Sequence, residues 1–497
     1  MHFLGLDIGT SAVKAVLTDS GQSVVARASA PLAIASPRAG WFEQDPADWW
    51  RATESAVGEV RGAAPVAFAS LSAIGLSGQM HGAVLLGPDT VPLRPAILWN
   101  DARAGTECIA LAEAVPDIAA IAGVKPMPGF TAPKLLWLRR HEPDTLARTR
   151  HILLAKDYVR LQLTGEIATD MVDAAGTLML DEARRDWSEE IVAAVGVGPE
   201  MLPRLREGNA PSGTLRREIA AAWGIAHPVL VAAGGGDVAA GAVGAGVVDN
   251  GDRLISLGTS AQIFFARDRY RPRPETLVHC FAHALPGRWF EMAALLNGAS
   301  CLNWLARLLN AEPATLIAEA ERAFRGAPSP VLFLPHLAGE RTPLDDPDAR
   351  GAFANVDHAT SRSDLIQAVL DGVALSLMDG FNALGEASDA ESIPVVGGGA
   401  RSSFWLRLIA SALGCSLTRI SGADDGPAFG AARLARLALT GEAIADVCTP
   451  PAVAETIAPD VDLTARYAAR FTAYRALTAS LREVRDATAD RPLAATR

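Results

Sequence analysis

An aspartate and a lysine frame a turn rich in glycine and hydroxyl groups near the N-terminus, in Asp7-Ile-Gly9-Thr10-Ser11-Ala-Val-Lys14. Gly9 lets the backbone approach a ligand closely, and the N–H groups and hydroxyls of Thr10 and Ser11 can donate to phosphate oxygens. Asp7 would repel phosphate, so its expected partner is Mg²⁺, which carboxylates commonly hold through water. Taken alone, the turn is equally consistent with an ordinary hairpin.

The same kind of turn returns half a chain later. The stretch Leu6 to Ala12 is echoed by Ile255 to Ala261, 249 residues further on. This second turn, Gly258-Thr259-Ser260, has neither the acid nor the lysine, which fits a role limited to holding phosphate. Two phosphate-binding turns and one metal-binding acid predict a nucleotide site between two related halves.

Another aspartate, Asp237, follows an apolar strand and three glycines and precedes a stretch rich in alanine and glycine. A strand end that leads into a helix is the usual crevice position in α/β sheets, and a carboxylate there can act as a general base. Two other interpretations stay open. Asp237 can cap the helix, or Gly234, Gly236 and Ala239 can belong to a dinucleotide-binding fingerprint.

Two further loops carry groups that suit small-molecule binding. In Ser77-Gly-Gln79-Met80-His81-Gly, an amide, a thioether and an imidazole suit a polyhydroxylated ligand, although a Met-His pair is more often structural. In Gly397-Gly398-Gly399-Ala400, bare backbone can lie flat against a purine. The dipeptide Gly-Lys never occurs, which excludes a Walker A loop.

Short strands and helices alternate along the chain and must position these groups, which predicts an α/β fold. Strands are expected at 3–6, 13–18, 24–29, 73–76, near 97, at 229–233 and at 393–396, and helices at 47–61, from 102, from 133 and at 463–484. The expected domains are 1–248 and 249–487, with a cleft between them that both turns face, and a tail at 488–497.

The composition limits the kinds of partner that the protein is expected to bind. The chain has 49% hydrophobic and 20% charged residues, the balance of a soluble globular protein, and its net charge of −11 gives no basic face for nucleic acid or a membrane. Five widely spaced cysteines argue against a disulfide framework or a zinc knuckle. No secretion signal is evident at the N-terminus, so the cytoplasm is the expected location and small molecules are the expected partners.

Together these motifs resemble the FGGY carbohydrate kinases of the actin-like ATPase superfamily. The resemblance spans Asp7 to about Leu439 and includes further matching stretches at 98–103, 129–141, 339–343, 397–405 and 426–432. It implies two ribonuclease H-like domains with a cleft between them, ATP and Mg²⁺ as cofactors, and a sugar as the second substrate. A homodimer is one expected assembly.

The resemblance also implies residue roles. Asp237 would be the catalytic base, Asp7 the magnesium-associated acid, and Asp237 with Gln79, Met80 and His81 the sugar contacts. Nucleotide binding would fall to Gly9, Thr10, Ser11, Lys14, Gly258, Thr259, Ser260, Gly397, Gly398, Gly399 and Ala400. No role follows for Asp101, Arg103, Glu340 or Arg341.

The expected reaction is phosphorylation of the 5-hydroxyl of D-xylulose. Ribulose, glycerol and gluconate are the alternative substrates, because Val238 stands where the family often has a polar amide. Two other classes of function lead to different expectations. An actin-like ATPase without a sugar would leave Met80 and His81 unexplained, and a nicotinamide dehydrogenase would require an NAD-dependent absorbance change.

Overall fold

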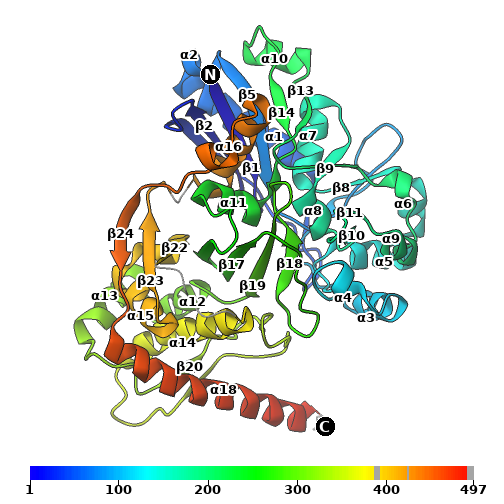
Figure 1. The fold of residues 1–497 in the computed structure, drawn as a ribbon. Helices are drawn as coiled ribbons and strands as arrows, with labels where there is room; N and C mark the ends of the chain where they lie inside the picture. The colour runs from blue at the N-terminus through cyan, green and yellow to red at the C-terminus, as the bar shows by residue number, and fades with distance from the viewer. Residues whose placement is uncertain (386–391, 423–424, 490–497) are drawn as a thin grey trace.

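Two seven-stranded sheets, one in each half of the chain, form the framework of the structure, a computed structural model that describes residues 1–385, 392–422 and 425–489 (Figure 1). The first sheet has the order β13-β14-β5-β1-β2-β3, and β15 also pairs with β5. Its strands are β1 (His2–Ile8), β2 (Ala12–Asp19), β3 (Val24–Pro31), β5 (Leu71–Gly78), β13 (Pro211–Thr214), β14 (Leu230–Ala232) and β15 (Gly235–Gly236).

The second sheet repeats this plan, with the order β18-β19-β17-β16-β22-β23-β24. In each sheet an antiparallel meander is joined by a parallel strand beside its first strand: β5 beside β1, and β22 beside β16. The prediction of two related α/β halves is confirmed. The strands are β16 (Arg253–Leu257), β17 (Ala261–Arg267), β18 (His279–Ala282), β19 (Trp289–Leu295), β22 (Ser392–Val396), β23 (Ser416–Ile420) and β24 (Val453–Ile457).

The first meander is longer than predicted because polar residues join its ladder. His2 pairs with Asp19, and Asp7 pairs with Lys14, although the apolar pattern alone placed His2, Asp7 and Asp19 outside the strands. The shorter strands are β4 (Glu43–Gln44), β6 (Val84–Leu86), β7 (Ala96–Ile97), β8 (His151–Leu153), β9 (Ala168–Asp170), β10 (Leu180–Asp181), β11 (Asp186–Trp187), β12 (Arg204–Arg206), β20 (Leu332–Leu334) and β21 (Ala352–Ala354).

Helices surround both sheets. In the first half they are α1 (Pro46–Ala63), α2 (Pro65–Phe68), α3 (Gly105–Ala114), α4 (Ile118–Ile121), α5 (Thr131–His141), α6 (Pro143–Arg148), α7 (Ala155–Thr164), α8 (Met171–Gly176), α9 (Glu189–Val195), η1 (Pro199–Met201), α10 (Arg217–Trp223) and α11 (Asp237–Ala245). In the second half they are α12 (Ser300–Leu308), α13 (Pro313–Ala323), α14 (Arg362–Ala383), η2 (Gly398–Arg401), α15 (Ser403–Leu413), α16 (Gly426–Thr440), α17 (Ile444–Val447) and α18 (Val461–Ala489). None of the described helices combines the length and apolar character that a membrane crossing requires.

The two faces of the second sheet differ because side chains alternate along each strand. Ile255, Ile263 and Val395 point into a core shared with α14 and α15. On the opposite face, Ser256 and Gln262 line the space between this sheet and α11. One face therefore holds the half together, and the other faces the first half.

Helix α16 comes late in the chain but covers the first sheet. It packs against β1, β5 and α11, and Figure 1 shows it next to α11 and over the strands of the first sheet. The approach is close: a Cβ at Gly5 would overlap the carbonyl oxygen of Ala428, and one at Gly75 would overlap that of Ala431. Glycine at these positions allows the helix backbone to lie directly on the sheet.

The C-terminal helix α18 docks on the second half, as predicted. Leu463, Tyr467 and Tyr474 are buried in the core of that half. The helix continues to Ala489, so the expectation of a tail beginning at 488 is wrong for its first two residues. The rest of that predicted tail, 490–497, lies outside the described residues.

Candidate active site

A cavity of about 650 Å³ separates the two halves, and both contribute to its walls. Lys14, Asp237 and Val238 line it from the first half. Gln262 lines it from the second half, together with the first two glycines of the stretch 397–399. The predicted cleft is therefore present, and Asp237 lines it, whereas residues 9–11 and 258–260 of the two turns are not in its described lining.

Strand β15 and helix α11 position Asp237. Gly234 has a φ of +82°, and a Cβ there would overlap the Leu76 carbonyl oxygen, so the backbone can turn from the sheet into the helix only with glycine. Asp237 is the first residue of α11, and its Oδ1 accepts from the Val238 N–H at 2.8 Å. Burial, and then the nearby charge of Asp7, raise the pKa of Asp237 to about 7. A carboxylate with that pKa is matched to general base catalysis near neutral pH.

Asp7 lies on β1, directly across the ladder from Lys14 on β2. Its carboxylate accepts from the Ser77 hydroxyl at 3.2 Å. Burial raises the pKa of Asp7, and the charge of Lys14 opposes this shift. The charge of Asp7 is one cause of the raised pKa of Asp237, so the two carboxylates lie near each other. Carboxylates beside bound phosphate are groups that hold Mg²⁺, so the donor set fits this ion.

Side chains support the first turn from below. Gln79 is only 2% exposed; it accepts from the Thr10 hydroxyl at 3.1 Å and donates to Gln44 Oε1 at 2.9 Å. Trp99 Nε1 also donates to the Thr10 hydroxyl, at 3.0 Å. The structure thus places Gln79 beneath the turn with its amide already bonded, whereas Ser11 is exposed at the tip. The sugar contact predicted for Gln79 stays a prediction.

The second turn is supported by backbone instead. The N–H groups of Gly298 and Ala299 donate to the carbonyl oxygens of Thr259 and Gly258, at 3.0 and 2.8 Å. Gly397, with a φ of +95°, lies against the same turn, since a Cβ there would come within 3.1 Å of the Gly258 nitrogen. The structure therefore brings the second turn and the triple glycine together.

A second cavity, of about 560 Å³, opens on the other side of the triple glycine. Leu302, Ile317 and Trp405 give it apolar walls, and Gly398 and Gly399 form its backbone edge. This arrangement suits a planar purine. Ser260 is partly buried in the second turn, and the side chain of Ala400 packs into the core of the second half.

Met80 and His81 lie behind the Asp237 loop and are absent from the described lining of the larger cavity. A Cβ on Gly236 would come within 2.6 Å of the Met80 sulfur, so the thioether rests directly against the residue that precedes Asp237. His81 Nδ1 donates to the Gly176 carbonyl oxygen at 2.7 Å. Burial is the main cause that lowers the pKa of His81 to about 3, so the ring is neutral and Nε2 is left as an acceptor.

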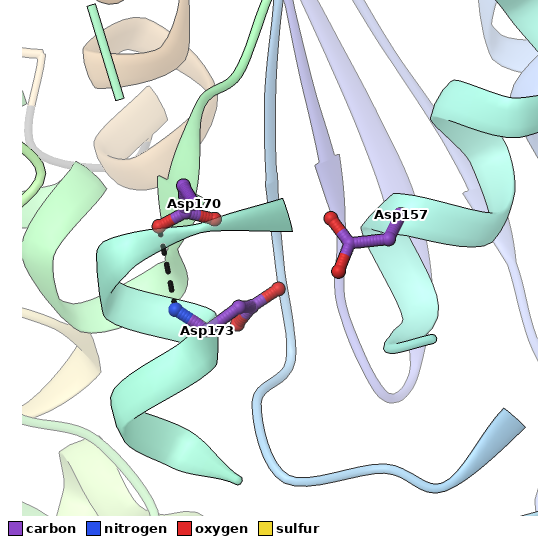
Figure 2. Close-up of side chains that lie close together, drawn as sticks. All are labelled: Asp157, Asp170 and Asp173. Atoms are coloured by element: carbon purple, nitrogen blue, oxygen red, sulfur yellow. Dashed lines mark hydrogen bonds between the residues drawn. The ribbon is translucent and has the colours of Figure 1, made fainter. Parts of the chain in front are cut away.

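A buried charge cluster lies beneath this loop, and the sequence analysis did not find it. Asp157, Asp170 and Asp173 converge as a metal site would (Figure 2). The Lys156 ammonium occupies the position of a cation, however: it is ion-paired with all three carboxylates, at 2.6 Å from Asp157 and 2.8 Å from Asp173. Burial opposes the charge on Lys156, but the three aspartates outweigh it and raise the pKa of the lysine.

Arg160 connects this cluster to the proposed base. Its guanidinium donates to Asp157 at 2.6 Å and to the carbonyl oxygen of Ala233, the residue before the three glycines of the Asp237 loop. The only available signal in the sequence was that Lys156 is one of four lysines in the whole chain. The cluster thus positions the loop and does not contact the cavity.

Two residues without an expected role, Asp101 and Arg103, also form a buried pair. Arg103 donates twice to Asp101, at 2.9 and 2.7 Å, and its guanidinium lies 3.8 Å from the ring centroid of Trp41. Asp101 also accepts from the Phe42 N–H at 2.7 Å. These contacts hold the loop after β7 in place.

Comparison with known proteins agrees with this geometry. Residues 2–244 match the N-terminal domain, and residues 254–439 the C-terminal domain, of the FGGY family of carbohydrate kinases. The xylulose kinase of Escherichia coli K12 is 44% identical over 482 residues, which cover 96% of this chain and 98% of the relative. The xylulose kinase of Klebsiella pneumoniae is 46% identical over 443 residues, 89% of this chain and 91% of the relative.

A solved structure shows the same fold. The crystal structure of a xyloylose kinase from Brucella ovis superposes with a TM-score of 0.94 at 45% identity, covering 97% of this chain and all of that one. Both halves therefore belong to one known architecture. The chain belongs to the FGGY family of carbohydrate kinases, which have the actin-like ATPase fold.

Proposed function

We propose that the protein transfers the γ-phosphoryl group of ATP to the 5-hydroxyl of D-xylulose. The observation that carries the proposal is Asp237, a carboxylate with a pKa near 7 at the start of a helix, in a cavity that both halves line. The relatives of 44 and 46% identity, both xylulose kinases, support the choice of sugar.

In this proposal Asp237 accepts the proton of the sugar hydroxyl as that oxygen attacks the phosphorus. Lys14 and the backbone N–H groups of the two turns at 9–11 and 258–260 hold the phosphates in line with the hydroxyl, and such positioning supplies most of the rate in phosphoryl transfer. Asp7 would hold Mg²⁺, which supplies charge neutralisation on the transferred group when bound. Purine binding is assigned to the cavity beside Gly398 and Gly399.

Sugar binding is assigned to Met80 and His81, which lie next to the Asp237 loop. Val238 lines the cavity where an amide would add a polar contact, so Val238→Asn tests the choice between pentuloses. A changed ranking of D-xylulose against ribulose would make position 238 a determinant of the sugar. An unchanged ranking would make Val238 neutral in that choice.

We also propose the division of the chain at 248/249 and a location in the cytoplasm. Cys108, Cys280, Cys301 and Cys448 form no disulfide within the part of the chain that the structure describes, which fits a reducing compartment. Helix α16 follows residue 249 in the sequence but packs on the first sheet. The boundary between the two domains in space would therefore differ from the boundary at 248/249 in the sequence.

An ADP-release assay across D-xylulose, ribulose, glycerol and gluconate tests the function. We expect D-xylulose to give the highest kcat/KM and a 5-phosphate product by ³¹P NMR. A higher value for another sugar would replace the substrate. ADP release at the same rate without any sugar would overturn the proposed phosphotransfer.

A further inference from the structure

A histidine of the second half lies buried beside the proposed sugar-binding residues without a hydrogen-bond partner. His279 begins the edge strand β18 and is only 1% exposed. Neither of its ring nitrogens has a partner among the residues that the structure describes. A buried polar group left unpaired is costly, so such a histidine is explained if a ligand completes its hydrogen bonding.

One phenylalanine ring connects this histidine to the first half. Phe130, from the stretch that resembles the first family signature, lies edge-on to His81 with ring centroids 4.5 Å apart. The same ring contacts His279 at 5.9 Å, and His279 stacks on Phe281 at 5.2 Å. His279 and His81 therefore approach each other across the boundary between the halves.

Arg341 adds a positive charge beside the start of β18, because the hydroxyl of the next residue, Thr342, donates to the Leu277 carbonyl oxygen at 2.9 Å. Its backbone is fixed: its N–H donates to Glu340 Oε1 at 2.9 Å and its carbonyl oxygen accepts from Asp345 at 2.7 Å. Its partly buried guanidinium makes no hydrogen bond or ion pair to any described residue, although arginine carries five donors. After burial, the charge of Arg341 is a cause that lowers the pKa of His279 well below its ordinary value, and it also lowers that of His81.

The donors and acceptors around this point are complementary to one end of a ketose. Arg341 can only donate, which suits a ketone oxygen or a hydroxyl oxygen. His81 Nε2 can only accept in its neutral ring, which suits a hydroxyl hydrogen, and His279 offers one donor and one acceptor. Asp237 lies beyond Met80 and Gly236, so these three groups would meet the end of the sugar remote from the transferred phosphoryl group.

We propose that Arg341 and His279 of the second half bind the carbonyl end of the ketose and select ketoses over the corresponding alditols. The inference rests on the proposed function and adds two sugar-binding residues to it. It also means that the sugar site is completed by both halves, as the nucleotide site is. A sugar bound here would bridge the halves through His81 on one side and Arg341 on the other.

Kinetics of Arg341→Met and His279→Phe test this assignment. We expect Arg341→Met to raise the KM for D-xylulose roughly 10- to 100-fold, because a hydrogen bond to a charged group is lost, with the KM for ATP within about twofold of wild type. Discrimination against xylitol and D-arabitol, which lack the ketone, should fall. Arg350→Met, an exposed arginine of the same segment, is the matched control and should change neither value.

His279→Phe keeps the ring and removes both nitrogens, so its outcomes are distinct. A higher KM for D-xylulose supports a sugar contact, whereas an unchanged KM with a higher Tm would identify a purely structural histidine. If Arg341→Met does not fold, Arg341→Lys replaces it, with an intermediate KM expected. Equal rises in the KM for sugar and ATP, or none, would overturn the proposal. Wild-type protein that does not phosphorylate D-xylulose would instead overturn the proposed function.

Discussion

The two strand-turn-strand units share a backbone plan but carry different side chains at equivalent positions. In the first unit the ladder pairs Asp7 with Lys14, next to the pair that closes the turn. At the same place in the second unit it pairs Ser256 with Gln262. Lys14, Ser256 and Gln262 all line the cleft. The duplication therefore repeats the shape of the turn that we propose to bind phosphate, while the aspartate and the lysine occur only in the first unit.

The supports of the two turns differ in the same way. Side chains hold the first turn, through Gln79 and Trp99 at the Thr10 hydroxyl. Backbone holds the second, where Gly397 packs directly against the turn and Gly298 donates to it. We infer that, of the two turns, the first brings charged groups to the phosphates, whereas the second offers a surface of bare backbone.

Asp237→Asn should have the largest effect on activity, because it removes the proposed base, which only the first half supplies. We expect kcat to fall roughly 10²- to 10⁴-fold, because the variant cannot accept the sugar proton, with little change in ATP binding. The Tm should not fall, since a carboxylate whose folded pKa exceeds its unfolded value destabilises the fold at neutral pH. Steady-state kinetics with Asp89→Asn, on an exposed loop of the same half, provide the control. Turnover within tenfold of wild type would remove Asp237 from the role of base.

Lys156→Met tests the support beneath the charged half. Removing the ammonium leaves three buried carboxylates with only Arg160 near them, and breaking a buried ion cluster in this way costs about 3–5 kcal/mol of unfolding free energy. Lys125→Met, at an exposed pair with Asp345, should cost less than about 1 kcal/mol. Urea unfolding of the two variants measures the difference. Equal losses of unfolding free energy in the two variants would show that the buried cluster contributes no more to stability than the exposed pair.

Asp7→Asn and Ser256→Ala compare the two equivalent ladder positions directly. If Asp7 holds Mg²⁺ through water, we expect the Mg²⁺ concentration for half-maximal rate to rise roughly 10- to 100-fold in Asp7→Asn. Ser256→Ala should leave that concentration unchanged. A titration of activity against Mg²⁺ decides between them. The same dependence in both variants would mean that the metal is not held on the first half.

The dependence of kcat/KM on pH is a second test of Asp237 as the general base. The base works only when it is deprotonated, so activity should rise as the pH passes upward through about 7 and fall as the carboxylate takes up a proton below it. Between pH 8 and pH 6 the change should be about tenfold. Rates that are flat over this range, or that increase toward acid, would contradict a base with this pKa.

Lys14→Gln and Gln262→Ala should give the smallest effects. Lys14→Gln gives the first turn the residue that the second turn has, and we expect the KM for ATP to rise about three- to tenfold as a phosphate contact is lost. Gln262→Ala should change it by less than about twofold. A larger effect at Gln262 would show that the second unit binds phosphate through its side chains as well.

The sequence predicted the α/β class, the duplication and the place of Asp237 where a strand leads into a helix, because these depend on local patterns. Strand, turn and helix signals lie within a few residues of each other. It did not predict the cluster around Lys156 or the approach of His279 to His81, since those contacts join segments far apart in the chain. Gln79 shows the same limit: its residue type suits a sugar, but only the fold shows that its amide is bonded to Thr10 and Gln44.

Helix α16 also sets a constraint on how the chain is made. The sheet of the first half has a face, at Gly5 and Gly75, that is shaped to receive a helix ending at Thr440. During synthesis at about 5–20 residues per second, the roughly 190 residues between Val248 and Thr440 take on the order of 10 to 40 seconds to follow. For that interval the nascent first half exposes an apolar, glycine-lined surface, and chaperone binding there would be strongest before residue 440 leaves the ribosome.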